Sequence, residues 1–308
     1  MSTTLFFLVP IGMLAAIWSL CFVGCVFQTG GIASPYSNLI LEGNPIAYWP
    51  LGDLEGPTAD DLTGHHHDGT YTIPKAYIPG TTPFTNPTLG LRQKSIVAGD
   101  VSVSGEVDKN LLPGSTDFEG GYVSIPWSTQ NSPQLPQFTL EAWIKPSPPG
   151  AGLLRVVFSA FINNTGFVVF IDQSNLLRVT IGTGTGNMMP PSTVPVDPTG
   201  TTYIAVSGDT NTGVVNVWKN PQTQSDLSNP PPPMPNQTIN ANYVAADPTQ
   251  LLAIFIGAGA NDQPVRSVDG GNGAPLLPFV GQIQDVALYG AVLDGNTLKN
   301  HFTNGQPS

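Results

Sequence analysis

The chain has 308 residues, a net charge of −11 and only ten Lys and Arg residues. Nucleic-acid binding needs a basic surface that neutralises phosphates, so this composition excludes a nucleic-acid partner and argues against attraction of the whole chain to anionic lipids. Hydrophobic residues make up 40% of the chain, enough for a sizeable core, and the 34 Gly and 31 Pro residues are typical of short strands joined by turns.

The first element is an apolar segment, because residues 5–27 contain no charged side chain. This length is close to the roughly 20 residues that span a hydrocarbon core, so we expect residues 1–27 to form a retained transmembrane anchor. Two alternatives stay open. One is an ordinary cleaved signal, although the leading MSTT has no basic residue, and the other is lipid attachment at Cys25 within the lipobox-like FVGC.

The anchor predicts a localisation and a packing surface. A short amino-terminal stub favours a single-pass membrane protein whose carboxy-terminal domain lies on the extracytoplasmic side, in the periplasm or on the cell surface. Small and hydroxyl side chains let membrane helices approach one another closely. The anchor offers four such residues, namely Gly12, Ala15, Ala16 and Ser19.

Residues 28–44 are predicted to form a linker, and residues 45–308 a single β domain that ends in a short helix. Within this domain, apolar runs alternate with turn-rich segments. The runs GFVVFIDQ (166–173) and LLAIFIGAG (251–259) are continuously apolar, which is typical of strands buried on both faces.

The run QFTLEAWIKP (137–146) alternates apolar and polar side chains with a period of two. Its even-numbered residues from Phe138 to Ile144 share one face of a strand, while Glu141 and Trp143 share the other. We therefore expect a strand with one face in the core and with Glu141 and Trp143 on the opposite face.

Two later segments carry signals for a hairpin and a helix. TTYIAVSGD (201–209) and GVVNVWKN (213–220) are joined by a turn, TNTG, whose Asn and Gly can adopt positive φ. LDGNTLKNHF (293–302) is the best helix candidate, with Asp294 as its N-cap.

The alternation of apolar runs and turns is interrupted by two proline-rich stretches, residues 187–200 and 222–238. Four consecutive prolines in the second stretch favour polyproline II and cannot lie in a central strand. They are Pro230, Pro231, Pro232 and Pro233. Two interpretations stay open: a rigid surface loop, or a docking surface for a neighbouring protein.

Five stretches follow one another in a recognisable order. They are PIAYWPLGD with TADDLTGHHHDGTY (45–71), DFEGGYVSIPW (117–127), FTLEAWIKP (138–146), FIGAGAND (255–262) and PFVGQIQDVALYGAVLDGNTLKNHF (278–302). Together they resemble bacterial laminin-G-like domains of the concanavalin A-like superfamily. The resemblance implies an all-β, two-sheet antiparallel jelly-roll sandwich of about a dozen strands.

The superfamily includes glycoside hydrolases, so we ask whether the sequence has the carboxylates that such an enzyme needs. Retaining hydrolysis uses two carboxylates about 5–5.5 Å apart, which a strand supplies at alternate positions. The laminarinase-like E-x-D-x-x-E pattern is absent, and no two of the five glutamates have that spacing. We therefore expect no enzyme activity and no catalytic residue.

Candidate ligand-binding residues are aromatic side chains with one carboxylate beside them. Trp143 and Glu141 share a strand face, and Trp127 closes another landmark stretch. Together with Trp218, Trp127 and Trp143 could form a platform on which a sugar ring stacks. The alternative is that loops cover these rings, as is common for aromatic residues on sheets.

The resemblance also implies a Ca²⁺ site at the rim of the sandwich, the one cofactor that we consider. Asp262, Asp269 and Asn272 lie on a Gly-rich stretch whose carboxylates and carbonyls suit this ion. The alternative is a solvated acidic loop. The run His65–His67 is expected to be a surface turn instead of a metal site, because adjacent side chains on an extended chain point to opposite faces.

Asn163 and Asn236 each begin a tripeptide that fits a glycosylation acceptor, which the sequence leaves unproven.

Three function classes remain open, and the one that the sequence supports least is a glycoside hydrolase; the other two are as follows. The first is a non-catalytic, membrane-anchored interaction module, an accessory subunit of a larger energy-transducing, light-harvesting or envelope complex. Its partners would be other subunits, contacted through the anchor and the proline-rich loops. The second is a surface adhesin or carbohydrate-binding module, with glycans as partners and with or without Ca²⁺.

Overall fold

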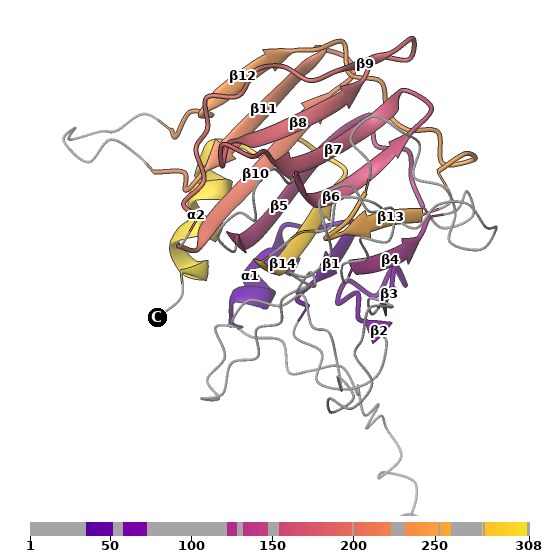
Figure 1. Ribbon diagram of the computed structural model, residues 1–308. Helices are drawn as coiled ribbons and strands as arrows, with labels where there is room; N and C mark the ends of the chain where they lie inside the picture. The colour runs from indigo at the N-terminus through magenta and orange to yellow at the C-terminus, as the bar shows by residue number, and fades with distance from the viewer. Residues whose placement is uncertain are drawn as a thin grey trace, which may run out of the picture. The chain divides into compact units, whose positions relative to one another are not determined.

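A computed structural model describes residues 35–51, 58–72, 122–127, 132–146, 154–198, 200–222, 232–251, 253–259, 279 and 281–306. These residues form two antiparallel sheets and two helices (Figure 1). The all-β class and the two antiparallel sheets predicted from the sequence are therefore confirmed.

The predicted anchor lies outside the described residues, as do Gly12, Ala15, Ala16, Ser19 and Cys25 within it. Across the part of the chain that is described, no helix has the length and apolar character needed to cross a membrane.

The first sheet has six strands and joins both ends of the β domain. In spatial order they are β1 (Ala47–Trp49), β14 (Gly281–Tyr289), β5 (Gln137–Pro146), β10 (Thr202–Asp209), β11 (Val214–Lys219) and β12 (Gln237–Asn240). The first and last of the described strands pair, with Ala47 opposite Leu288. Long-range pairing therefore closes the domain around its central strand, β5.

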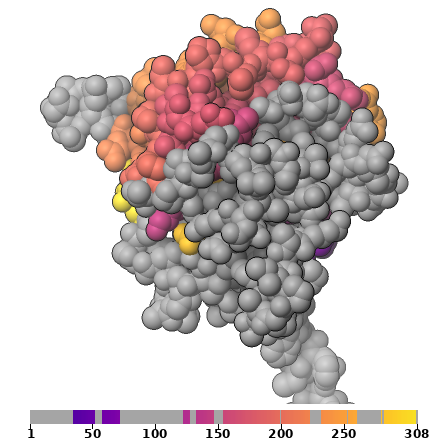
Figure 2. All heavy atoms as spheres, viewed as in Figure 1, coloured from indigo at the N-terminus to yellow at the C-terminus, as the bar shows by residue number. Residues whose placement is uncertain are grey.

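The second sheet has eight strands. In spatial order they are β2 (Thr58–Ala59), β3 (Gly69–Thr72), β4 (Tyr122–Pro126), β13 (Ala253–Ile256), β6 (Arg155–Ile162), β7 (Thr165–Ile171), β8 (Leu177–Gly182) and β9 (Asn187–Met188). The residues of β8 to β12, coloured salmon to orange, form a continuous surface at the top of the space-filling view (Figure 2).

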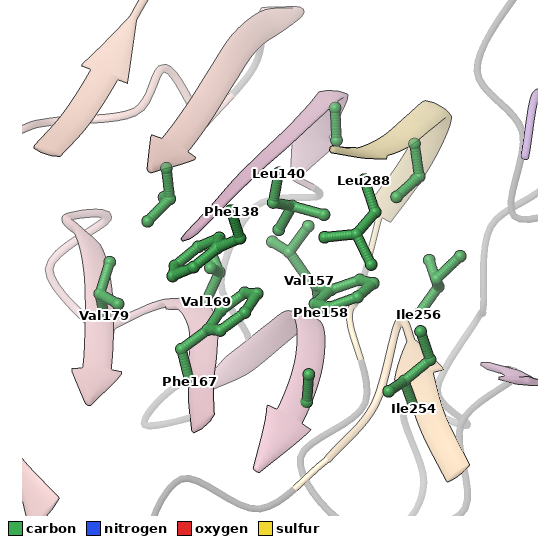
Figure 3. Close-up of a cluster of buried hydrophobic side chains, with 14 of the residues drawn as sticks. Phe138, Leu140, Val157, Phe158, Phe167, Val169, Val179, Ile254, Ile256 and Leu288 are labelled. Carbon is green, nitrogen blue, oxygen red and sulfur yellow. The ribbon is translucent and has the colours of Figure 1, made fainter. Parts of the chain in front are cut away.

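The core lies between the two sheets, and the period-two pattern of β5 is confirmed. Phe138, Leu140, Ala142 and Ile144 are all buried in the main hydrophobic cluster. Phe138 of one sheet stacks on Phe167 of the other, with ring centroids 3.8 Å apart and an interplanar angle of 5° (Figure 3). The two continuously apolar runs form β7 and β13, whose side chains are buried almost throughout, as predicted.

The predicted hairpin and closing helix are also confirmed. Strands β10 and β11 pair from Asp209 with Val214 onward, and Gly213 in the turn has a φ of 67°, whereas the turn's Asn keeps a negative φ. Helix α2 (Gly295–Gly305) begins after Asp294, whose carboxylate accepts the amide hydrogens of Asn296 at 2.8 Å and Thr297 at 3.1 Å.

The structure corrects the expected linker over residues 28–44. Residues 35–42 of this segment form helix α1 (Pro35–Glu42), in which Tyr36 and Ile40 are buried. These two side chains lie four positions apart and so share one helix face, which packs in the same cluster as α2.

The two proline-rich stretches lie against each other beside β12. Gln237 of the second stretch donates from Nε2 to the carbonyl oxygen of Pro191 at 2.7 Å, and its Oε1 accepts the amide hydrogen of Thr193 at 3.4 Å. Lys219 of β11 also donates from Nζ to the carbonyl oxygen of Pro195 at 2.9 Å. Pro232 is exposed and Pro233 is buried, whereas Pro230 and Pro231 lie outside the described residues. The stretches thereby join the edges of the two sheets.

Replacing Phe138 with Ala should lower the free energy of unfolding by about 3–5 kcal/mol, because the stacked ring leaves a cavity between the sheets. Urea unfolding followed by fluorescence measures this change. Met189→Ala, at a side chain that is 53% exposed, is the control and should alter stability by less than about 0.5 kcal/mol. Equal effects of the two substitutions would contradict the placement of the core.

Candidate functional site

The buried ionisable side chains that could take part in chemistry lie on the outer face of the six-stranded sheet. This is the face turned away from the core. Strand β5 places Glu141 and Trp143 there, as the alternation predicted, and the register sets Ala205 of β10 and Ala287 of β14 beside Glu141. Helices α1 and α2 pack against this face. The small alanines leave room for the larger side chains that converge on Glu141.

Glu141 is completely buried, and three side chains reach its carboxylate. The hydroxyl group of Tyr203 donates to Oε2, and that of Tyr289 donates to Oε1 at 2.7 Å. His301 of α2 places Nδ1 at 3.0 Å from Oε2 and 3.1 Å from Oε1. An ionised carboxylate only accepts hydrogen bonds, so it matches these donors. Strands β5, β10 and β14 and helix α2 therefore meet at one side chain.

Helix α1 is tied to the same face by two polar contacts. The indole nitrogen of Trp143 donates to the hydroxyl oxygen of Tyr36 at 3.0 Å. The hydroxyl groups of Ser37 and Tyr48 lie 3.1 Å apart, and Tyr48 in turn donates to Oδ1 of Asp285 at 2.5 Å. Asp285 is thus a second buried carboxyl group beneath the helices.

A β-bulge places Asp285 in this position. The register of β14 against β5 shifts between Gln284 and Ala287, so β14 carries one extra residue there. Asp285 has a φ of 52°, a left-handed conformation that Asp tolerates better than most residues. The bulge turns a carboxyl group toward Tyr48 where a regular strand would continue its ladder.

Burial and neighbouring charge shift several pKa values in this cluster. Burial raises the pKa of Asp285 to about 7, the hydrogen bond from Tyr48 opposes this, and the charge of Glu141 adds to it. For His301, burial alone would lower the pKa, but the charge of Glu141 and its hydrogen bond outweigh burial and raise it. Burial also raises the pKa of Tyr203, which therefore stays a neutral donor.

The structure does not bring the three expected ligand-binding residues to a surface. Glu141, Trp143 and Trp127 are 0%, 4% and 1% exposed. Trp143 stacks against Phe302 of α2, and Trp127 belongs to the main core and stacks on His67. The expected sugar-stacking platform is therefore corrected, because no ring face of these residues is open to a ligand.

The three adjacent histidines lie in different surroundings. His65 and His66 are exposed, whereas His67 is buried. Asp61 organises this turn, because its Oδ2 accepts the amide hydrogen of His67 at 3.0 Å and its Oδ1 accepts that of Tyr48 at 3.0 Å. Within the described ranges, no group of three or more His, Cys, Asp and Glu residues could hold a metal ion.

The predicted Ca²⁺ ligands Asp262, Asp269 and Asn272 lie outside the described residues. The two glycosylation candidates are exposed and already hydrogen-bonded. Asn163 donates from Nδ2 to Gln250 at 2.7 Å, and Asn236 accepts the amide hydrogen of Lys219 at 2.5 Å.

The sequence did not reveal Tyr203, Tyr289, His301 and Asp285 as members of this cluster. All four lie far from Glu141 in the sequence: Tyr203 is 62 residues away, Tyr289 is 148 and His301 is 160, while Asp285 shares β14 with Tyr289. One feature of the sequence could have predicted the cluster, namely the single glutamate on the outer face of a strongly apolar strand. If that carboxylate is buried, other side chains must donate hydrogen bonds to it.

No protein-family model matches the chain, and no curated protein matches its sequence. One similar solved structure is the binding domain of botulinum neurotoxin DC in complex with rat synaptotagmin II. Its TM-score is 0.50 at 12% identity, over 86% of this chain and 52% of that chain. The same binding domain in complex with SialylT has a TM-score of 0.50 at 11% identity, with the same two coverages.

This chain spans about half the length of those structures. At such identities the likeness shows the fold alone, a jelly-roll-like β-sandwich. It agrees with the two antiparallel sheets described above.

Replacing Glu141 with Gln should destabilise the fold by about 3–5 kcal/mol, because the amide group presents a donor to side chains that already donate, and His301 loses its partner. Thermal and urea unfolding measure the loss. Glu42→Gln, at an exposed carboxylate of α1, is the matched control and should be close to neutral. A fully stable Glu141→Gln protein would show that the cluster is not structural.

The contribution of His301 should depend on pH. Its raised pKa means that the folded state holds a proton that the unfolded chain has released, so its contribution is complete below about pH 6.5 and declines as the pH rises through the folded value. The stability difference between the natural chain and His301→Gln should therefore shrink from pH 5.5 to 8.5 in urea titrations. A difference that grows over this range would reverse the sign of the coupling.

Proposed function

We propose that this chain is a non-catalytic binding module, and the burial of Glu141 is the observation that carries the proposal. A glycosidase carboxyl group must reach the glycosidic oxygen or the anomeric carbon of its substrate. Glu141 instead is covered by α2 and accepts hydrogen bonds from Tyr203, Tyr289 and His301. This arrangement supports a structural role for the residue that most resembles a catalytic acid.

The resemblance to laminin-G-like domains supports the same proposal. Its landmark stretches supply β1, β4, β5, β13 and β14, and the closing stretch supplies α2. The neurotoxin structures of similar fold are binding domains, and one of them is bound to synaptotagmin II. Since one fold hosts many functions, the proposal of a binding role rests mainly on the complete burial of the Glu141 carboxylate.

The finer proposal is a membrane-anchored accessory subunit with its sandwich on the extracytoplasmic side. The uncharged segment of residues 5–27 supports the anchor. The joined proline-rich stretches support a docking surface, because Pro232 is exposed and Met234 beside it is 78% exposed. Large exposed apolar side chains on a rigid edge are typical of protein contacts.

Extraction of the full chain with a mild detergent tests the subunit proposal. Partner proteins should co-purify in fixed stoichiometry, and the intact mass should include residues 1–27. Met234→Ala should weaken the association, while Val292→Ala, 41% exposed on a different turn, serves as the control. A lone chain that begins after residue 34 would contradict the anchored subunit.

A carbohydrate-binding module is the second candidate, and the part of the outer face beside β12 favours it. Thr238 and Asn240 are exposed there, and Thr238 donates to Oδ1 of Asn216 at 2.9 Å. Amide and hydroxyl groups without charge suit the hydroxyl groups of neutral sugars.

A glycan array, probed with and without Ca²⁺, tests the second candidate. Specific retention that Asn240→Ala weakens and that Gln173→Ala leaves unchanged would support it. If the array retains no glycan, the carbohydrate candidate is removed. Hydrolysis of laminarin by the purified natural chain would overturn the non-catalytic proposal as a whole.

A further inference from the structure

Asp285 is a buried carboxyl group with a connection of its own to helix α1. It is 7% exposed and lies at the bulge of β14, where its amide donates to the carbonyl oxygen of Pro50 at 3.2 Å. Its Oδ1 accepts the hydroxyl hydrogen of Tyr48. The Glu141 cluster does not use this carboxyl group as a hydrogen-bond partner.

A chain of hydroxyl groups leads from Asp285 to α1. A tyrosine hydroxyl has one hydrogen, and Tyr48 gives it to Asp285, so Ser37 is the donor in the 3.1 Å contact with Tyr48. Ser37 belongs to the first turn of α1, beside Tyr36. The docking of this helix is therefore linked directly to the state of one carboxyl group.

Burial and the charge of Glu141 make a negative charge on Asp285 costly, and the hydrogen bond from Tyr48 offsets only part of this cost. The titratable groups on this face are Tyr36 of α1, Tyr48 of β1, Glu141 of β5, Tyr203 of β10, Tyr289 of β14 and His301 of α2. Among the titratable groups just named, the one that can carry a positive charge is His301, which is already paired with Glu141. Ionisation of Asp285 would thus add a second buried negative charge to a site that has one.

We propose that Asp285 is a pH-sensitive latch for α1, which stays docked while this carboxyl group is protonated and lifts when it ionises. Of the two helices that cover this face, α1 is the shorter, with eight residues against eleven in α2. Its described burial involves mainly Tyr36, Ser37 and Ile40, so lifting it brings water to Asp285 at the smallest loss of packing.

The pKa of about 7 places this transition near neutral pH. The docked state favours the protonated carboxyl group, so docking is strongest below the ordinary pKa of about 3.9 and weakens as the pH rises toward 7. Above that value Asp285 is ionised in both states and the loss is complete. The latch does not depend on the proposed binding function, since it concerns only the attachment of α1.

The latch would control the length of chain that leads to the sandwich. Residues 35–42 directly follow the predicted anchor and the short segment after it. Each residue of an undocked segment can span up to about 3.3–3.6 Å when extended. This consequence, unlike the latch itself, rests on the proposed anchor: a sandwich held at a membrane by residues 1–27 would gain reach as the pH rises.

Hydrogen exchange of the full chain in detergent, read by mass spectrometry at pH 6 and pH 8, tests the latch. After correction for intrinsic exchange, the opening constant of peptides covering residues 35–42 should rise about tenfold between these values, if lifting restores an ordinary carboxyl pKa. Peptides of β7 should show no comparable rise. Equal opening of α1 at both pH values would overturn the proposal.

Asp285→Asn is the decisive variant, because Asn keeps the size of Asp, tolerates the positive φ and does not titrate. It should abolish the pH dependence of α1 while leaving the helix docked. Asp209→Asn, a carboxylate at the far end of β10 that accepts from Gln137, is the control and should keep the rise. A rise that persists in Asp285→Asn, or that occurs equally in α1 and β7, would also overturn the latch.

Discussion

A single buried carboxylate determines how the outer face of the six-stranded sheet is built. An isolated ionised group away from water is so unfavourable that Glu141 requires donors on several sides. Tyr203, Tyr289 and His301 supply them from two neighbouring strands and the final helix. One carboxylate therefore joins three strands of the sheet, β5, β10 and β14, to helix α2.

This constraint changes how the aromatic residues of the face are understood. A glutamate beside a tryptophan on a strand is a common arrangement for sugar binding, yet here both are interior groups. Trp143 lies between Tyr36 of α1 and Phe302 of α2, so its ring and its indole hydrogen are both occupied. The partner surface proposed above therefore lies at β12 and the proline-rich stretches instead of at Glu141 and Trp143.

Local patterns in the sequence predicted the elements well because each depends on neighbouring residues. Alternation in β5, apolar continuity in β7 and β13, and the Asp294 cap are set within a few positions. Helix α1 was missed since its eight residues carry neither an acidic first turn nor a basic last turn. The linker prediction failed there because tertiary packing of Tyr36 and Ile40, rather than local signals, stabilises the helix.

The candidate site was harder to predict than the fold for a physical reason. Residue type suggested that Glu141 and Trp143 share a face, which is correct, but exposure depends on what covers that face. The covering residues lie about 100 residues before and 160 residues after β5, as the contacts of Tyr36 and His301 show. Only the assembled sheet turns a possible ligand site into a buried hydrogen-bond cluster.

A double-mutant cycle between Glu141 and His301 tests the central claim most directly. If one carboxylate joins β5 to α2, the free energies of unfolding of Glu141→Gln, His301→Gln and the double variant should reveal a coupling of about 1–3 kcal/mol. Additivity within about 0.5 kcal/mol would contradict the claim, since it would show that the two side chains stabilise the sandwich independently.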